Sequence, residues 1–147
     1  MSIFDSFSIN ASGLTAERYR MDVISENIAN IDTTRTEDGT PYRRKLVTFE
    51  EKGKNGTFAS VLAKAKGDYV GGGVRVGKTY EDTETEMKMV YDPSHPDADE
   101  NGYVTYPNVN VITEMTDLID ASRSYEANAT AFSASKSMAV KGLEMAQ

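Results

Sequence analysis

The amino-acid sequence predicts an α+β fold, in which long N- and C-terminal helices form an antiparallel, coiled-coil-like pair with a small β-rich insert between them. Apolar residues recur at helical spacing in residues 3–30 and 110–146. All four prolines and nine of the eleven glycines lie between these two segments. We therefore divide the chain into residues 1–32 and 108–147, the two parts of a helical core, and residues 33–107, the insert with its loops.

The N-terminal segment carries one apolar stripe, because spacings of three, four and seven residues fall on one side of a helix. Ser2 and Asp5 are suited to cap its start, and the polar residues from Asn27 to Thr33 end it. Gly13 lies inside the segment, where glycine costs about 1 kcal/mol relative to alanine. The stripe consists of Phe4, Phe7, Ala11, Leu14, Met21, Ile24 and Ile28.

The C-terminal segment repeats every seven residues in two rows, as a helix that packs along a seam does. Pro107 precedes the helix, Asn110 is suited to cap it, and Glu114 is one of several acids that complement the positive end of its dipole. Small residues in the second half of the rows would let a neighbouring backbone approach closely. The first row is Val111, Leu118, Tyr125, Phe132 and Ala139, and the second is Met115, Ser122, Ala129, Lys136 and Leu143.

The central segment alternates apolar and polar residues in short runs that are typical of strands. A short helix is expected over 58–65, turn-rich loops over 50–57 and 92–102, and a flexible hinge at the three glycines 71–73. The expected strands are residues 42–49, 74–80, 88–91 and 103–106.

The terminal helices should need packing partners. Ordering about 65 helical residues costs about 1–2 kcal/mol of backbone entropy for each of them. Burial of the apolar face offsets most of that cost, and an isolated pair would leave half of each stripe exposed. We therefore expect termini that are largely unfolded in the dilute monomer and that order on polymerisation, which favours an assembly subunit over an enzyme.

The composition argues against several other classes of function. The net charge is −7 and no long segment is basic, which disfavours a nucleic-acid surface or a membrane-bound helix. Cysteine is absent, which excludes disulfides, thiol nucleophiles and thiolate metal sites. The N-terminal residues lack the pattern of a secretory signal peptide, and no stretch has the roughly 20 apolar residues of a membrane-spanning helix. We expect no cofactor and no catalytic or metal site.

The loop Asp92–Asn101 offers a different chemistry. His95 is the single histidine and lacks convergent partners, so we interpret it as a solvated loop residue and not as a catalytic one. Asp97 and Asp99 resemble the first ligands of a calcium loop, but Asn108 stands where the bidentate glutamate belongs. An ion-binding protein that uses this loop is therefore one alternative function.

Several motifs resemble those of bacterial flagellar axial proteins. Residues 12–16 and 24–33 resemble the N-terminal signature of rod and hook proteins, whose core Asn-x-Ala-Asn-x-x-Thr stands here at Asn27 to Thr33. The resemblance runs nearly end to end and is weakest over 50–70 and 78–88. Three further stretches, in this order and spacing, resemble the proximal-rod family of the flagellar basal body, the FlgC family: residues 38–45, 90–104 and 107–128.

The resemblance implies a structural protein of cell motility and not an enzyme. Proteins of this family polymerise helically through their terminal helices into the rod, a hollow drive shaft that transmits torque from the motor to hook and filament. The implied partners are copies of the chain, other rod and axial proteins and the flagellar type III export apparatus, without nucleic acid, membrane insertion or small-molecule substrate. The implied location is the basal body, across the periplasm or cell wall, reached without a cleaved signal peptide.

The resemblance and the apolar rows together predict an assembly interface. We expect Asn27 and Asn30 to cap or bridge backbone groups where the first helix ends. Arg123 should anchor the helix interface by charge-assisted hydrogen bonds and Tyr125 by its ring. A secreted module that docks its helices into a groove on one partner is the other alternative. The expected interface residues are Leu14, Asn27, Ala29, Asn30, Thr33, Leu118, Arg123, Tyr125, Asn128 and Phe132.

Overall fold

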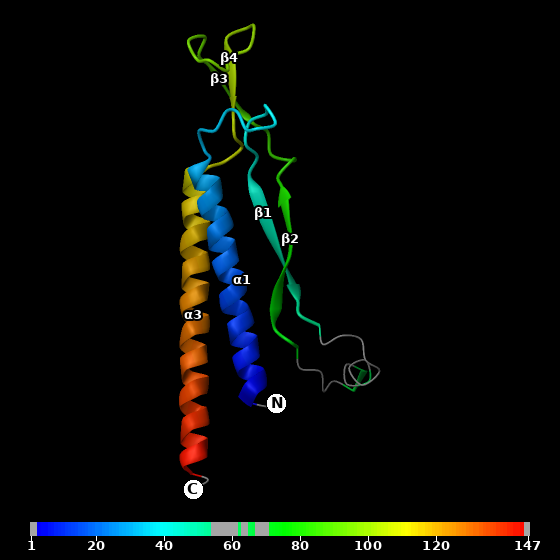
Figure 1. The fold of residues 1–147 in the computed structure, drawn as a ribbon, viewed down its shortest axis with the longest axis vertical. Coiled ribbons are helices and arrows are strands. Elements are labelled where there is room, and N and C mark those ends of the chain that lie inside the picture. Colours follow the sequence, from blue (N-terminus) through cyan, green and yellow to red (C-terminus); the bar gives the residue numbers. More distant parts are fainter. Residues whose placement is uncertain (1–2, 54–61, 63–64, 67–70, 146–147) are drawn as a thin grey trace. The chain divides into compact units, whose positions relative to one another are not determined.

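A computed structural model describes residues 3–53, 62, 65–66 and 71–145, with the backbone alone for residues 3 and 4. Helices α1 and α3 lie side by side, and the strands lie between them in the sequence, which confirms the predicted α+β fold (Figure 1). The short helix expected over 58–65 falls largely outside the described residues. The elements are α1 (Ile3–Ala29), β1 (Lys45–Glu51), β2 (Val74–Glu81), β3 (Lys88–Tyr91), β4 (Tyr103–Tyr106) and α3 (Val111–Glu144).

Both helices begin and end close to the predicted residues. At the start of α3, Asn110 Oδ1 accepts a hydrogen bond from Ile112 N–H at 3.0 Å, so Asn110 is the N-cap that the sequence suggests. At the end of α1, the backbone N–H of Asn30 donates to Glu26 O at 3.1 Å. The Asn30 side-chain amide donates to the same carbonyl at 2.9 Å, so Glu26 O accepts two hydrogen bonds from Asn30.

The strands form two two-stranded sheets, one of β1 with β2 and one of β3 with β4. Strands β3 and β4 coincide with the predicted ranges and pair antiparallel, with Val90 opposite Val104 and Tyr91 opposite Tyr103. Strand β1 begins at Lys45 and not at residue 42 as expected. The reason is that Tyr42 N–H donates to Thr33 O at 3.1 Å, so this backbone pairs with the turn after α1.

The chain forms two compact units, each described by itself below. The first unit comprises Met1–Tyr19, Thr48–Gly77 and Ala121–Gln147, and the second comprises Arg20–Val47 and Lys78–Asp120. Both helices and the sheet of β1 and β2 contribute residues to each unit.

In the first unit, α1 and α3 approach each other through small residues. Gly13, Ala16 and Ala121 are buried, and a Cβ on Gly13 would lie 2.9 Å from Asn128 Oδ1. The glycine that the sequence marks as unfavourable therefore permits a close helix contact. The rings of Phe7 and Phe132 pack edge to face with centroids 5.1 Å apart and add an aromatic contact to the pair.

Two sequence expectations fail in the first unit. Ala11 was expected on the packed stripe but is exposed, because the buried side of α1 passes through Gly13 and Ala16. The glycines at 71–73 were expected to form a hinge, yet Gly73 has a φ of 99° and its carbonyl accepts from Lys52 N–H at 2.8 Å. Residues around Gly73 are therefore docked and not free.

Strand β2 is docked on α1 at its first residue. Ser12 Oγ accepts a hydrogen bond from Val74 N–H at 3.0 Å and donates to Ile9 O at 2.7 Å. A Cβ on Gly73 would overlap Ser12 Oγ and would lie 3.3 Å from the Cα of Ile9. Glycine at 73 is therefore required both by the left-handed backbone and by the approach to the helix.

The second unit buries larger and more polar side chains. Its apolar core consists of Val23, Ile24, Tyr42 and Val104, each less than one-tenth exposed. All buried polar side chains among the described residues also belong to this unit: Asn27, Asp82, Asn108 and Glu114. Such groups require hydrogen-bonding partners, and those partners define the site described next.

Candidate assembly interface and polar clasp

A buried polar cluster in the second unit joins the end of α1 to the start of α3. We call it the clasp and define it by Asn27, Arg44, Lys45, Asn108 and Glu114. Its members come from α1, from the segment that begins β1 and from the first turns of α3 and the residues before it. Asn27 and Glu114 are each only 1% exposed, so every polar atom of theirs must find a partner inside the protein.

Glu114 is the buried charge of the clasp. One carboxylate oxygen accepts from Arg44 Nε at 2.6 Å, and the other accepts from Asn27 Nδ2 at 3.0 Å. Arg44 also contacts Asp117 Oδ2 through Nη2 at 3.3 Å. A buried carboxylate is tolerated only where a cation and further donors compensate its desolvation, and Arg44 and Asn27 provide both.

The side-chain amide of Asn27 binds the backbone of Lys45. Its Oδ1 accepts from Lys45 N–H at 2.8 Å, and its Nδ2 donates to Lys45 O at 2.9 Å. The Tyr42 hydroxyl also donates to Asn27 Oδ1, at 3.0 Å. The amide thus supplies the donor and acceptor that a neighbouring strand would offer to the first residue of β1.

Asn108 holds the preceding residue in the same way. Its Oδ1 accepts from Arg44 N–H at 2.9 Å. Its Nδ2 donates to Asp82 O at 2.9 Å and to Thr85 O at 3.2 Å. Asp82 N–H donates to Arg44 O at 2.8 Å, so residues 44 and 45 are bonded on both sides by segments that are distant in the sequence.

The surroundings of the clasp fix two protonation states at neutral pH. Burial, together with the carboxylates of Glu26, Glu114 and Glu81, raises the pKa of Tyr42 to about 12. Hydrogen bonds from the backbone and hydroxyl of Thr85 lower the pKa of Asp82. Tyr42 therefore remains a neutral donor to Asn27, and Asp82 remains an ionised acceptor that caps its own turn.

The structure places the N-terminal interface residues at the end of α1. Asn27 and Asn30 contact backbone groups there, as expected, although no described non-glycine residue has a positive φ. Thr33 Oγ1 donates to Asn30 Oδ1 at 3.1 Å. Leu14 is half-buried in the first unit, and Ala29 is exposed in the second.

The C-terminal interface residues differ in how far the chain itself covers them. Leu118, Asn128 and Phe132 are half-buried, and Asn128 Nδ2 donates to Ser124 O at 2.9 Å. Tyr125 is 36% exposed. Arg123 is exposed and makes none of the expected charge-assisted bonds with the part of the chain that the structure describes.

The two predicted rows on α3 are only partly covered by the chain itself. In the first row Leu118, Phe132 and Ala139 are half-buried, and Val111 and Tyr125 are exposed. In the second row Ser122 and Ala129 are half-buried, and Met115, Lys136 and Leu143 are exposed. Residues one position before this row are also covered: Glu114, Ala121, Asn128 and Ser135. Two of these are large polar residues that apolar spacing alone assigns to the solvent side, yet Glu114 has Arg44 and Asn27 as partners.

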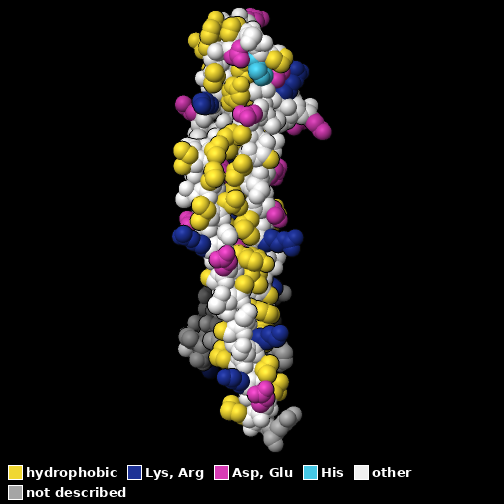
Figure 2. Space-filling model, turned by 90° about the vertical axis from the view of Figure 1, so that its left-hand side faces the viewer, with side chains coloured by type: hydrophobic (Ala, Val, Ile, Leu, Met, Phe, Trp, Pro, Cys, Tyr) yellow, Lys and Arg dark blue, Asp and Glu magenta, His cyan; other side chains and the backbone are white. Residues whose placement is uncertain are grey.

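Helix α3 consequently exposes large apolar side chains in both units, and Figure 2 shows hydrophobic side chains on the surface along the face turned to the viewer. In the second unit Ile112 is 77% exposed, and Met115 and Ile119 are also exposed. In the first unit the exposed apolar residues of α3 include Met138, Val140 and Leu143. Exposed apolar residues at such helical spacing are suited to bury against another helix.

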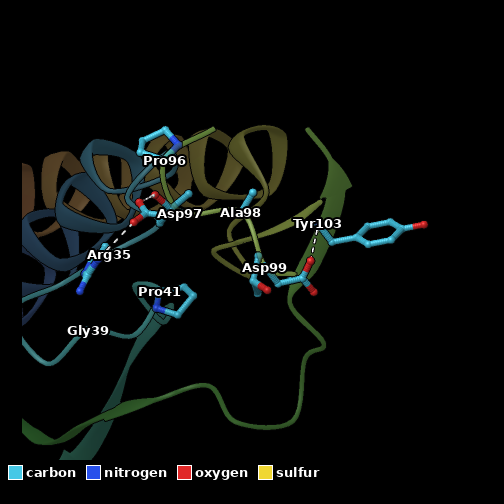
Figure 3. Close-up of a pocket in the computed structure, with 10 residues that line it drawn as sticks. Arg35, Gly39, Pro41, Pro96, Asp97, Ala98, Asp99 and Tyr103 are labelled. Atoms are coloured by element: carbon cyan, nitrogen blue, oxygen red, sulfur yellow. Dashed lines mark hydrogen bonds and ion pairs between the residues drawn. The ribbon is translucent and has the colours of Figure 1, made fainter. Parts of the chain in front are cut away.

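The β3–β4 hairpin exposes a second apolar surface. Met89, Tyr91 and Tyr103 are all exposed and share one face, and the two tyrosine rings pack edge to face with centroids 5.3 Å apart. A pocket of about 430 Å³ lies beside this hairpin, between residues 34–41 and 96–105 (Figure 3).

The acidic residues of this pocket stabilise its loop. Asp97 accepts from Thr34 Oγ1 at 2.8 Å and pairs with Arg35 at 3.5 Å, as Figure 3 shows for Arg35. Asp99 Oδ1 accepts from Tyr103 N–H at 2.8 Å. His95 is not simply solvated as expected: it is half-buried, and its Nδ1 accepts from Asp97 N–H at 3.1 Å.

Within the described ranges, no group of three or more His, Cys, Asp or Glu side chains is placed to hold a metal ion. The carboxylates of the calcium-like loop instead bond to neighbouring protein groups. Nor does either described helix have the length and apolar character needed to cross a membrane.

Comparison with known proteins agrees with these features. The family model described as "Flagella basal body rod protein" matches residues 7–35, and that described as "Flagellar basal body rod FlgEFG protein C-terminal" matches residues 100–145. The first match includes Asn27 of the clasp. The second includes Asn108 and Glu114 of the clasp and the exposed apolar residues of α3.

Relatives match along the whole chain. The flagellar basal-body rod protein FlgC of Bacillus subtilis is 47% identical over 99% of both chains, and that of Borreliella burgdorferi is 45% identical over 100% of this chain and 99% of its own. The Salmonella typhimurium FlgC is 39% identical over the full length of both. The chain belongs to the FlgC family of flagellar basal-body rod proteins.

Proposed function

We propose that this chain is a structural subunit of the rod of the bacterial flagellar basal body. The observation that carries the proposal is the identity of 47% with the Bacillus subtilis rod protein over essentially the entire length of both chains. An architecture of long terminal helices with exposed apolar residues suits a subunit that completes its packing in an assembly.

The terminal helices, residues 1–32 and 108–147, act as the polymerising core in this proposal. Each large apolar side chain of α3 that a neighbour buries contributes roughly 1.5–3 kcal/mol. Arg123 then finds its carboxylate or carbonyl partner on another subunit. The fully buried Asn27 has its partners within the chain and is left out. The proposed contact residues are the other nine predicted from the sequence, joined by the exposed residues Ile112, Met115 and Ile119.

The insert, residues 33–107, acts as an outward-facing module that selects partners among other rod and axial proteins. The exposed face of the β3–β4 hairpin, with Met89, Tyr91 and Tyr103, supports this role because it is apolar and aromatic. The subunit transmits torque mechanically and performs no catalysis. It reaches the basal body through the flagellar type III export apparatus.

The test replaces apolar residues on the exposed face of α3. Ile119→Asp and Met115→Asp should abolish motility in soft agar and leave basal bodies without a complete rod in electron micrographs. Because both side chains are more than half exposed, the purified variants should keep the helical content of the parent chain. Ile119→Leu and Met115→Leu, which keep an apolar side chain at the same positions, are the matched controls and should leave motility intact.

Two results would overturn the proposal. One is wild-type motility and complete rods in both aspartate variants. The other is a purified parent chain that forms only a discrete complex of fixed stoichiometry with one partner, which is the outcome that the docking-module alternative requires.

A further inference from the structure

The start of α3 bears a groove, largely apolar, that the second unit leaves open. The groove has a volume of about 490 Å³, and all of its lining residues belong to that unit. Ile112, in the first turn of the helix, lines the groove and is 77% exposed. Two exposed charged residues, Glu86 and Lys88, also line it, and their side chains make no hydrogen bond or ion pair with the part of the chain that the structure describes. The apolar lining consists of Ile31, Pro107, Val109, Val111 and Ile112.

The last turns of α3, in the first unit, are apolar and uncovered. Met138 and Met145 are 67% and 83% exposed, and Val140 and Leu143 are 47% and 71% exposed. At 100° per residue, the two methionines lie on one side of the helix and the other two residues on the opposite side. A helix that is apolar on more than one side is suited to be enclosed by other groups, and not to lie on a surface with one face in water.

These two surfaces cannot meet within one chain. Helix α3 is continuous over 34 residues, which makes it about 50 Å long (Figure 1). The groove lies at its first turn and the apolar end at its last turns. A contact between the two surfaces therefore joins two molecules head to tail, and such a contact extends into an open filament unless the rotation between subunits closes a ring.

The two surfaces are also complementary in charge. The C-terminal end of a helix is partly negative and the N-terminal end is partly positive, so the last turn of one helix is attracted to the first turn of the next. Lys141 and Glu144 lie among the apolar residues of the helix end, and no described residue pairs with either side chain. Glu86 and Lys88 offer the opposite charges beside the groove, so each free charge on one surface has a counterpart on the other.

We propose that the groove at the start of α3 receives the end of the C-terminal helix of an adjacent rod subunit, a helix end of the kind that residues 138–145 form in this chain. The inference rests on the proposed rod function and names the contact that links one subunit to the next. The family model that matches residues 100–145 spans both the helix end and most of the groove, so a subunit with this region carries the occupant. The groove and its occupant order together as subunits meet, because each covers the apolar residues of the other.

The test maps this contact in assembled basal bodies. Ile112 is replaced by the photoreactive amino acid benzoylphenylalanine in cells that carry no other copy of the chain. Purified basal bodies are irradiated and digested, and the cross-linked peptides are identified by mass spectrometry. Position 112 should attach to the last two turns of the C-terminal helix of an adjacent rod subunit, which are residues 138–145 where that subunit is a second copy. The same amino acid at Thr130, an exposed residue of α3 outside both surfaces, should not label that helix end.

A smaller substitution gives a second readout if the bulky side chain prevents assembly. The chain has no cysteine, so Ile112→Cys introduces a single thiol. This thiol should react with a maleimide in the purified chain and be shielded from it in basal bodies. Equal reactivity in the two forms would overturn the inference.

The helix end is tested separately at Leu143, which is 71% exposed and loses little intramolecular contact when it is changed. Leu143→Asp should abolish motility because a carboxylate cannot enter an apolar groove without loss of its hydration, and Leu143→Met should keep motility. Wild-type motility of the aspartate variant would overturn the inference.

The cross-links separate this inference from the proposed function. Attachment of position 112 to any other part of a subunit would overturn the inference and leave the rod function intact. Absence of the parent chain from purified basal bodies would overturn the proposed function, and the inference with it.

Discussion

The two units hold the same pair of helices together by opposite means. In the first unit the buried residues of the pair are Gly13, Ala16 and Ala121, and one aromatic pair adds to them. In the second unit a buried ion pair and two asparagine amides connect the helices to the segment between them. Small apolar contacts tolerate sliding and repacking, whereas a polar cluster is satisfied in one register only. The second unit therefore specifies the register, and the first keeps a surface that can adapt to neighbours.

The largest effect should come from removing an asparagine of the clasp. Asn27→Ala leaves the Lys45 backbone and the Tyr42 hydroxyl without their partner, so we expect a loss of about 3 kcal/mol in the free energy of unfolding. Asn30→Ala, which breaks one exposed bond to Glu26, should cost about 0.5–1 kcal/mol. Urea unfolding followed by circular dichroism measures the loss in each variant. Equal losses would show that Asn27 contributes no more to stability than an exposed residue at a helix end.

The next effect probes the docking of β2 in the first unit. Gly73→Ala places a methyl group against Ser12 and strains a backbone with φ of 99°, so we expect a loss of about 2 kcal/mol. Gly53→Ala meets nothing within 4 Å and is the control. Hydrogen exchange of residues 74–77 should increase in the first variant alone, and unchanged exchange would show that the contact with α1 is dispensable.

A third effect is the loss of stability of the second unit at alkaline pH. Because the pKa of Tyr42 is raised from 10 to about 12, its contribution is fully present below pH 10 and is lost as the pH rises to about 12. The expected loss between pH 9 and pH 11.5 is about 2 kcal/mol. The urea midpoint of the parent chain should therefore fall between pH 9 and pH 11.5, and that of Tyr42→Phe should not. A decline of the same size in the variant would assign the alkaline sensitivity to another group.

The smallest effect concerns the aromatic pair of the first unit. A double-mutant cycle of Phe7→Ala and Phe132→Ala should give a coupling of about 0.5–1.5 kcal/mol beyond the loss of burial. The same cycle on Asn27 and Glu114 should give a larger coupling, because both groups are fully buried. A larger value for the phenylalanines would reverse the comparison between the units.

The sequence predicts the helices, two of the strands and the cap at Asn110 because these follow from local spacing and local hydrogen bonds. The position of Glu114 could not be found in this way. An acid in the first turn of a helix has a sufficient local reason to be there, namely the helix dipole, so nothing marks it as buried. Its true partners, Asn27 and Arg44, are distant in the sequence and become visible only in three dimensions.

The burial of Glu114 and Asn128 on α3 has a related cause. Spacings of three and four residues identify a helix face, but either neighbouring row fits the pattern equally well. Hydrophobicity favours Met115 and Leu143, which the structure exposes, whereas Glu114 and Asn128 are covered. The exposed apolar residues are left for a partner outside the chain, in keeping with the expectation that an isolated pair of helices leaves half of each stripe exposed.

Two asparagine amides take the place of a neighbouring strand beside residues 44 and 45. The second unit therefore depends on side chains that slow hydrolysis can convert to aspartate. Asparagine is among the thermolabile residues. Hydrolysis of Asn27 or Asn108 to aspartate replaces an NH₂ group that faces a backbone carbonyl with a carboxylate oxygen, and attraction becomes repulsion. Loss of either amide would therefore release the backbone of residues 44 and 45 from the segments that hold it.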